Sequence, residues 1–331
     1  MAVMVTGGTG FVGLNVVQAL LARGEHVVAV ALDDMPAIAL RELATLPGTL
    51  DTVRADVRHE DAFRGLLRHF NVDRLFPFAA ITSGAERERD GPEAVIDVNL
   101  LGFIAQLRAA RDAGVRRVIV PSSGAALGEA FYQRALLDEA TTPALPIGVY
   151  GVTKYAVERT ALRLAGLWGM DLIVARIGSV FGPWERATGL RDLLSPWWQI
   201  AGHAAAGREA VLPADLPPYT WIYGPDIASG LVHLLDMQAP PHPVFHVCSG
   251  QSWDDVLATF AATLMPHFPA FSWRQSADPA QVNVQLTETQ PRGRMDTARI
   301  NATGWQASFG PDAACQDYAR WLADRPGATN P

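Results

Sequence analysis

MAVMVTGGTGFVG occupies residues 1–13 and joins an apolar run to three glycines at positions 7, 10 and 13. Residues 1–6 have the composition of a buried strand, and the residues after Gly13 have that of an amphipathic helix. Gly7 can take the tight turn that side chains forbid, Gly10 lets the backbone approach a pyrophosphate, and Gly13 lets the helix pack closely on the sheet. The helix N-terminus adds free N–H groups and a positive dipole end. The segment therefore predicts a dinucleotide-binding turn, and the alternative is a glycine-rich turn without a ligand.

Size and composition restrict the class of protein. The chain has 331 residues, 49% of them hydrophobic, which is enough for one large domain or two smaller ones. The net charge of −7 and the lack of a long basic stretch argue against nucleic acid or an anionic membrane as partner. Two cysteines, Cys248 and Cys315, suggest no disulfide framework. No apolar run reaches membrane-spanning length, and the glycine turn begins too early for a signal peptide, so we expect a cytoplasmic location.

Apolar strand-like runs alternate with helical patterns through the first half of the chain. Strands are expected at residues 27–31, 75–80, 118–120 and 172–175, and helices at 14–23, 61–69, 94–113 and 150–168. Strands that are apolar throughout and separated by helices indicate a parallel sheet covered on both faces. The fold class predicted is α/β, a Rossmann-type doubly wound parallel sheet with a smaller C-terminal α/β lobe.

The pattern changes after Arg176, where proline, glycine and tryptophan become frequent. We assign residues 1–176 to a dinucleotide-binding domain and residues 177–217 and 249–331 to a substrate-binding lobe. Residues 218–248 are expected to return to the first domain, because 221–223 and 244–247 could rejoin its sheet.

A second motif carries the chemistry. Tyr150 and Lys154 are four residues apart, so a helix stacks them on one face, where a lysine ammonium favours the phenolate form of the tyrosine. Such a tyrosine can exchange a proton with a substrate hydroxyl or carbonyl. Ser123 follows the strand at 118–120, at the sheet edge where ligands bind in open α/β folds. Alone, the Tyr150/Lys154 pair could be an exposed helix face and Ser123 a helix cap, since each pattern is common by chance. The order and spacing of the glycine turn, Ser123 and the Tyr150/Lys154 pair together are much more specific.

These segments together resemble the extended short-chain dehydrogenase/reductases, the NAD-dependent epimerase/dehydratase family, over most of the chain. The resemblance implies that Ser123, Tyr150 and Lys154 are the catalytic set, with Tyr150 as acid/base and Lys154 also holding the nicotinamide ribose. It places Asn99 at a structural asparagine of the central helix, which we count with the cofactor site. The other residues that it assigns to the cofactor are Gly7, Gly10, Phe11, Val12, Gly13, Asp56, Val57, Ala79 and Ala80.

The second strand departs from the family pattern. The acidic residue that commonly ends this strand and binds the adenosine ribose is replaced by Ala31, while Asp33 and Asp34 follow two and three residues later. We assign Asp33 to the ribose, with solvation of the loop as the alternative. No Arg or Lys lies between Gly24 and Leu40 to pair with a 2′-phosphate, so NAD is expected, with NADP as the open alternative.

The substrate end departs as well. Nucleotide-sugar members usually carry asparagine where this chain has Ser179, and arginine near Tyr219. We therefore assign substrate contacts to Ser123, Ser179, Arg186 and Arg191; a surface salt bridge is the alternative for each arginine, as it is for Arg292 and Arg294. Ser123 is followed by glycine and alanine in place of the Asp-Glu pair of dehydratases, so sugar dehydration is not expected.

Three functions follow from these observations. The first is an NAD(P)-dependent oxidoreductase acting on a small hydroxylated or carbonyl compound, such as a hydroxy acid or sugar acid. The second is a nucleotide-sugar epimerase with tightly bound NAD. The third, a non-catalytic NAD(P)-sensing protein, conflicts with the intact Ser123, Tyr150 and Lys154.

The resemblance also implies a homodimer, through the helices at 94–113 and 150–168. Apolar faces on these helices could equally belong to an intramolecular core. The eight histidines show no metal-ligand spacing, since Pro243 interrupts the pair His242 and His246, and no metal is expected.

Overall fold

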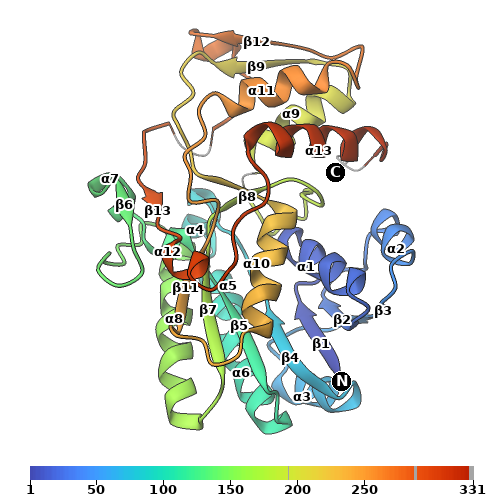
Figure 1. The fold of residues 1–331 in the computed structure, drawn as a ribbon, viewed down its shortest axis with the longest axis vertical. Coiled ribbons are helices and arrows are strands. Elements are labelled where there is room, and N and C mark those ends of the chain that lie inside the picture. Colours follow the sequence, from blue (N-terminus) through green and yellow to red (C-terminus); the bar gives the residue numbers. More distant parts are fainter. Residues whose placement is uncertain (193, 287–288, 328–331) are drawn as a thin grey trace.

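A parallel β-sheet forms the centre of the computed structural model, which describes residues 1–192, 194–286 and 289–327 (Figure 1). Within these residues the sheet has seven strands in the order β11-β7-β5-β4-β1-β2-β3, and every neighbouring pair is parallel. This confirms the predicted Rossmann-type sheet. The strands are β1 (Ala2–Thr6), β2 (His26–Ala31), β3 (Thr49–Arg54), β4 (Val72–Pro77), β5 (Arg117–Ser123), β7 (Leu172–Ile177) and β11 (Val244–Val247).

Helices cover both faces of the sheet because its strands are apolar on both sides. One face, with Val3 and Val5, packs against α1 (Phe11–Ala22) and α10 (Gly224–Asp236). The other face, with Met4 and Val28, packs against α3 (Glu60–His69), α6 (Gly102–Ala113) and α8 (Val149–Trp168). All these side chains are fully buried. The carboxyl ends of the strands point toward the smaller lobe, at the top of Figure 1.

The helix expected at residues 94–113 is built from three pieces. These are α5 (Pro92–Ile96), the π-helical segment η1 (Asp97–Leu101) and α6. A π-helical turn widens the helix locally and frequently marks a functional site. Its buried residue is Asn99.

The smaller lobe packs around aromatic side chains. It contains α9 (Pro196–Ala205), α11 (Val256–Leu264) and α13 (Pro311–Ala323), with β9 (Glu209–Pro213) and β12 (Ser272–Ser276) paired in parallel. The rings of Phe181 and Trp197 stack at a centroid distance of 3.6 Å, and those of Phe260 and Tyr318 stack at 5.2 Å. These contacts give the lobe a core of its own.

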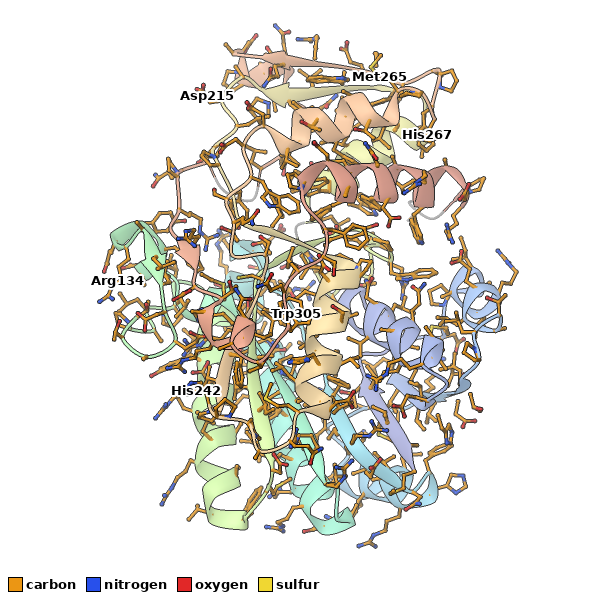
Figure 2. All side chains as sticks on the ribbon, in the orientation of Figure 1. Arg134, Asp215, His242, Met265, His267 and Trp305 are labelled. Atoms are coloured by element: carbon orange, nitrogen blue, oxygen red, sulfur yellow. The ribbon has the colours of Figure 1, made fainter. Side chains whose placement is uncertain are left out.

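Two parts of the expected chain division need correction. Residues 244–247 return to the central sheet as β11, but β10 (Trp221–Tyr223) pairs with β8 (Ser179–Phe181) in a separate two-stranded sheet. The segment 249–331 is also not confined to the lobe. Ile300 and Trp305 pack into the core of the main domain, and Trp305 lies beside α10 in Figure 2. The indole N–H of Trp305 donates to Ser229 Oγ of α10 at 2.9 Å.

The remaining elements are short. They are α2 (Ala37–Leu43), α4 (Ala85–Asp90), η2 (Gly124–Ala126), α7 (Ala130–Gln133), β6 (Leu136–Leu137), η3 (Pro279–Gln281), β13 (Arg294–Met295) and α12 (Ala298–Asn301). In the part of the chain that the structure describes, no helix is both long enough and apolar enough to cross a membrane.

Candidate active site

A cavity of about 410 Å³ lies at the carboxyl ends of the strands, beneath the smaller lobe. It runs from the loops after β2 and β3, past the glycine turn, to the start of α8 and the segment around Tyr219. Most residues that the sequence assigned to a site line this one cavity. They are Gly7, Gly10, Phe11, Val12, Gly13, Asp33, Asp56, Val57, Ala79, Ala80, Ser123, Tyr150, Lys154, Ser179, Arg186 and Arg191.

The glycine turn has the shape that an anion cradle requires. Gly7 has φ +63°, and a Cβ there would lie 2.9 Å from the backbone nitrogen of Ala79. A Cβ on Gly13 would overlap the carbonyl oxygen of Gly7. The N-cap of α1 is Gly10, and the N–H groups of the following first turn have no acceptor within the helix. These groups and the helix dipole fit a phosphate group in the cavity.

An arginine holds the acidic residue after β3. Arg58 donates to both carboxylate oxygens of Asp56, from Nε at 3.0 Å and from Nη2 at 2.6 Å. These hydrogen bonds lower the pKa of Asp56 below its usual value. Arg58 also lines the cavity and was not among the residues assigned from the sequence. The pair fixes one wall at the end of the cavity opposite Tyr150.

Arg186 and Arg191 lie nearer the glycine turn than expected. Arg186 donates from Nη2 to the carbonyl oxygen of Thr9 at 2.9 Å, and burial lowers its pKa while Asp33 partly offsets that effect. The Arg191 guanidinium lies 6.0 Å from the ring centre of Phe11 and 3.7 Å from the buried carboxylate of Glu185. Both arginines thus lie over the turn expected to hold the cofactor, and their assignment to substrate stays a prediction.

Asn99 also needs correction, since it lies behind the cavity wall. Its Oδ1 accepts from the N–H of Ile81 at 2.8 Å, and its Nδ2 donates to the Ile81 carbonyl at 2.9 Å and to Thr153 Oγ1 at 3.1 Å. Ile81 lines the cavity, and Thr153 lies on α8 between Tyr150 and Lys154. Asn99 therefore acts on the site through the loop and helix that it joins.

Two elements, β5 and α8, bring the three catalytic candidates to the same wall. Ser123 ends β5, and its Oγ accepts from the N–H of Ala125 at 3.1 Å. Tyr150 is in the first turn of α8, and Lys154 follows one turn later. The buried Lys154 donates from Nζ to the carbonyl oxygen of Pro121 at 3.0 Å, and Nζ lies 5.6 Å from the Tyr150 ring centre. A serine hydroxyl, a phenol and an ammonium group thus face one space, as proton exchange with a substrate oxygen requires.

The same face of α8 continues into a buried polar network. Glu158, one turn beyond Lys154, accepts from Arg176 Nε at 2.9 Å and from Nη2 at 2.6 Å, and Ser122 Oγ donates to it at 3.2 Å. Arg176 Nη1 lies 3.4 Å from Nε2 of His246, whose Nδ1 lies 3.1 Å from the carbonyl oxygen of Asp296. Since a carbonyl only accepts, this arrangement places the imidazole proton on Nδ1.

At the other end of the cavity three side chains form a chain of hydrogen bonds. The Tyr219 phenol oxygen lies 2.9 Å from Ser179 Oγ and accepts from Arg292 Nη1 at 2.7 Å. The Arg292 guanidinium stacks on Phe131, 3.9 Å from its ring centre. Tyr219 and Trp221 line the cavity but were not assigned from the sequence. The sequence does hold one indication of Tyr219, since this chain has a tyrosine near the position where nucleotide-sugar members carry an arginine.

No group of three or more His, Cys, Asp or Glu side chains able to hold a metal ion occurs among residues 1–192, 194–286 and 289–327.

Comparison with known proteins gives relatives that include epimerases and reductases. UDP-glucose 4-epimerase of Streptomyces lividans is 28% identical over 338 residues, which cover 98% of this chain and 96% of that protein. 2'-Dehydrokanamycin reductase of Streptomyces kanamyceticus is 31% identical over 251 residues, 75% of this chain and 61% of the reductase. Several curated relatives at 30–34% identity are matched over 50–61% of their own length.

The fold is also found in solved structures. The UDP-glucose 4-epimerase of Thermotoga maritima, crystallised with UDP-glucose, superposes with a TM-score of 0.77 at 20% identity, over 98% of this chain and 99% of that one. The model of the NAD dependent epimerase/dehydratase family matches residues 3–248. With its Rossmann-type sheet, its glycine turn and this match over most of its length, the chain belongs to the NAD-dependent epimerase/dehydratase family.

Proposed function

We propose that this protein is an NAD-dependent oxidoreductase that transfers a hydride between the nicotinamide and a small hydroxylated or carbonyl substrate. The observation that carries the proposal is that Ser123, Tyr150 and Lys154 line the same cavity as the glycine turn. A hydroxy acid or a sugar acid is the first substrate class to test.

The cavity fits a dinucleotide. Gly7 and Gly13 have no room for a Cβ atom, because neighbouring backbone lies too close. The N–H groups in the first turn of α1 are available to bind a pyrophosphate. The carboxylate of Asp33 lines the far end, where it favours a ribose 2′-hydroxyl over a 2′-phosphate. Arg186 adds a positive charge at that end, so NADP is the alternative that a binding titration with both cofactors must test. We assign Arg186 and Arg191 to the cofactor half of the site.

The proposed roles follow from the contacts. When bound, the nicotinamide supplies or accepts the hydride at its C4 carbon. The Tyr150 hydroxyl exchanges a proton with the substrate oxygen, and Ser123 Oγ holds that oxygen by a hydrogen bond. The Pro121 carbonyl holds Lys154 Nζ at 5.6 Å from the Tyr150 ring centre, where the ammonium group can also bind the nicotinamide ribose.

The substrate end supports a small hydroxylated molecule. Its polar groups are the hydroxyls of Ser179 and Tyr219, with Arg292 behind Tyr219. Tyr219 and Ser179 share one hydrogen bond in which either hydroxyl can donate, so the proton of the other hydroxyl is left as a donor to the substrate. A hydroxyl or carboxylate oxygen fits this donor, and no diphosphate is needed to explain it.

The decisive experiment incubates the purified chain with NAD and a panel of hydroxy acids and sugar acids. We expect the absorbance of reduced nicotinamide to rise with at least one of them. Turnover of a UDP-sugar without net reduction of NAD, and with no panel compound turned over, would refute the proposal.

The second candidate is a nucleotide-sugar epimerase. It is favoured by the match to UDP-glucose 4-epimerase of Streptomyces lividans over 98% of this chain. This candidate predicts that NAD stays bound through purification, because an epimerase re-reduces its own intermediate and needs no exchange of cofactor. Interconversion of UDP-glucose and UDP-galactose with bound NAD would establish it.

A homodimer through α6 and α8 and a cytoplasmic location remain proposals. Apolar side chains are exposed on η1, which leads into α6, and on α8, at 54% for Leu101, 49% for Val152 and 58% for Leu167. Burial of such side chains against a second copy would be favourable. Sedimentation equilibrium tests the dimer, and the variant Leu167→Glu is expected to shift it to monomer.

A further inference from the structure

Two segments far apart in sequence are fastened together along the wall of the cavity. The first, the α4 arm, is residues 82–90 and contains α4; the second, the strap, is residues 188–192 of the smaller lobe. The N–H of Thr82 donates to the Leu190 carbonyl at 2.8 Å, and the N–H of Asp192 donates to the Thr82 carbonyl at 3.2 Å. Thr82, Leu190 and Arg191 line the cavity. These hydrogen bonds join the two segments where both form the wall of the cavity.

Arg87 is the main side-chain link between the two segments. Its Nε and Nη2 donate to Asp192 Oδ1 at 2.8 and 2.7 Å, and Nη2 also donates to the Gly189 carbonyl at 2.7 Å. The N–H of Gly84 donates to Asp192 Oδ2 at 2.7 Å. Hydrogen bonds from Arg87 hold the pKa of Asp192 below its usual value, so the carboxylate is charged at neutral pH. Such a two-pronged pair fixes geometry as well as distance.

The next residue of α4 reaches the catalytic helix. Glu88 Oε1 accepts from the backbone N–H of Tyr150 at 3.3 Å and from Ser83 Oγ at 2.8 Å. The N-cap of α8 is Gly148, which has no side chain to cap the helix, and a Cβ there would lie 3.0 Å from Glu88 Oε1. The carboxylate of Glu88 therefore serves as a cap from another segment, where the helix dipole favours negative charge.

We propose that α4 is a latch, in which Arg87 fastens the strap over the cofactor cavity and Glu88 positions the first turn of α8 that carries Tyr150. Closure of the strap and alignment of the catalytic tyrosine then occur together, because Arg87 and Glu88 are adjacent on one short helix. The latch sets how fast the cofactor exchanges, which is the property that separates a net oxidoreductase from an enzyme that retains its NAD. The part played by Tyr150 rests on the proposed function; the control of cofactor release does not.

The first test measures release of NADH from the full chain by stopped-flow fluorescence, with excess NAD as the trap. Arg87→Gln and Asp192→Asn are each expected to speed release about three- to tenfold, the range for loss of a well-formed ion pair. The double variant is expected to release no faster than either single one, because both break the same link. Arg89→Gln, at an exposed position of the same helix, is the matched control and should leave release unchanged. Unchanged release in both single variants, or additive effects in the double variant, would overturn the latch.

The second test follows the link to α8 without using turnover. Amide hydrogen exchange of residues 149–151 is expected to rise in Glu88→Ala, and also in Arg87→Gln although Arg87 does not touch α8. It should stay at the wild-type rate in Arg89→Gln. If Arg87→Gln speeds the release of NADH but leaves the hydrogen exchange of residues 149–151 unchanged, the proposed coupling between the strap and α8 is refuted.

The third test separates positioning from a general structural role. With an active substrate, Glu88→Ala is expected to lower kcat about fivefold, as for loss of a helix cap, with KM unchanged. Glu88→Gln keeps an oxygen for the Tyr150 N–H and should restore kcat to within about twofold. Glu86→Ala, at an exposed position of α4, is the control. A rise in KM alone, or no recovery with glutamine, would contradict the role of Glu88. Absence of any turnover would refute the proposed function and leave the first two tests to decide the latch.

Discussion

The side chain of Asn99 forms hydrogen bonds with both backbone polar groups of Ile81, accepting from its N–H at 2.8 Å and donating to its carbonyl at 2.9 Å. An amide side chain is one of few that can satisfy an N–H and a C=O of the same residue at once. The π-helical segment η1 brings Asn99 to this position, where it is 4% exposed. The wall of the cavity at Ile81 and the helix α8 are therefore joined through one buried amide.

Asn99→Ala is expected to lower the free energy of unfolding by about 1–3 kcal/mol, because it leaves the buried polar groups of Ile81 without partners. The affinity for NAD should fall as well, since the loop that lines the cavity loses its anchor. Urea unfolding and a fluorescence titration with NADH measure the two effects. Gln238→Ala removes an exposed amide and is the control. An unchanged unfolding midpoint would contradict the anchoring role.

Tyr150→Phe is expected to reduce turnover by about 10²–10⁴-fold, the usual contribution of a positioned acid or base. Cofactor affinity should stay close to that of the wild type, because only the phenol oxygen is removed. Steady-state kinetics and the NADH titration give both values. Tyr155→Phe removes a phenol oxygen from the same helix outside the cavity lining and should have little effect. A Tyr150→Phe variant with a normal rate would refute the mechanism.

Tyr219→Phe tests the substrate end of the cavity. Loss of the phenol oxygen breaks the hydrogen-bond chain from Arg292 to Ser179. We expect KM to rise about tenfold, the effect of about 1.4 kcal/mol, with a smaller change in kcat. Ser179→Ala should have an effect of similar size, and the two effects should not add because the residues share one chain. Additive effects would show that they act separately.

The sequence predicted the central sheet well where strands are apolar throughout. β2 and β7 were expected close to their observed bounds, β5 was expected only at 118–120, and the glycine turn lies where its spacing required. The edge strand β3, with sequence TLDTVR, was missed because its residues are exposed or half-buried and it has no continuous apolar run. The π-helical segment was also missed, since a hydrophobic pattern does not distinguish a widened turn from a regular helix.

The proposed catalytic residues could be brought to one cavity from the sequence because they follow short local rules, four residues apart on a helix or at the end of a strand. Contacts between distant segments could not be predicted in this way. Arg186 reaches the carbonyl of Thr9, which is 177 positions away in sequence, and no local rule indicates this contact. The pairing of β10 with β8 was missed for the same cause, because an apolar triplet has no signal that selects its partner strand.

Gly7→Ala is expected to weaken NAD binding and to destabilise the fold. Gly7 has φ +63°, which a residue with a Cβ rarely adopts, and the added carbon would lie 2.9 Å from backbone that cannot move aside. Gly65→Ala is the matched control, because a Cβ there meets no described atom within 4 Å and Gly65 lies within α3. That control should stabilise the protein by about 0.5–1 kcal/mol. Thermal unfolding without NAD measures the stability of each variant, and the shift of the midpoint on adding NAD measures cofactor binding. Equal midpoints for the two variants would refute the strain argument.

His246→Gln is expected to make stability less dependent on pH. His246 is fully buried, and burial, followed by the charges of Arg176 and Arg299, lowers its pKa to about 3. Its backbone N–H donates to Glu139, a buried carboxyl whose own pKa is raised by burial. Titration of Glu139 therefore changes the free energy of unfolding with pH in the opposite direction to titration of His246. The difference between the wild type and His246→Gln isolates the contribution of the histidine.

The direction of the His246 effect follows from proton binding. Below about pH 6.5 the unfolded chain takes up a proton at His246, while the folded chain does not until about pH 3, so the stability from the neutral imidazole is present above pH 6.5 and is lost as the pH falls. Between pH 7 and pH 5 this loss is about 2 kcal/mol in the wild type and absent in His246→Gln. Urea unfolding across this range measures it, and His267→Gln, at an exposed position (Figure 2), should follow the wild type. If the wild type and His246→Gln lose stability in parallel, His246 is not held neutral by its surroundings.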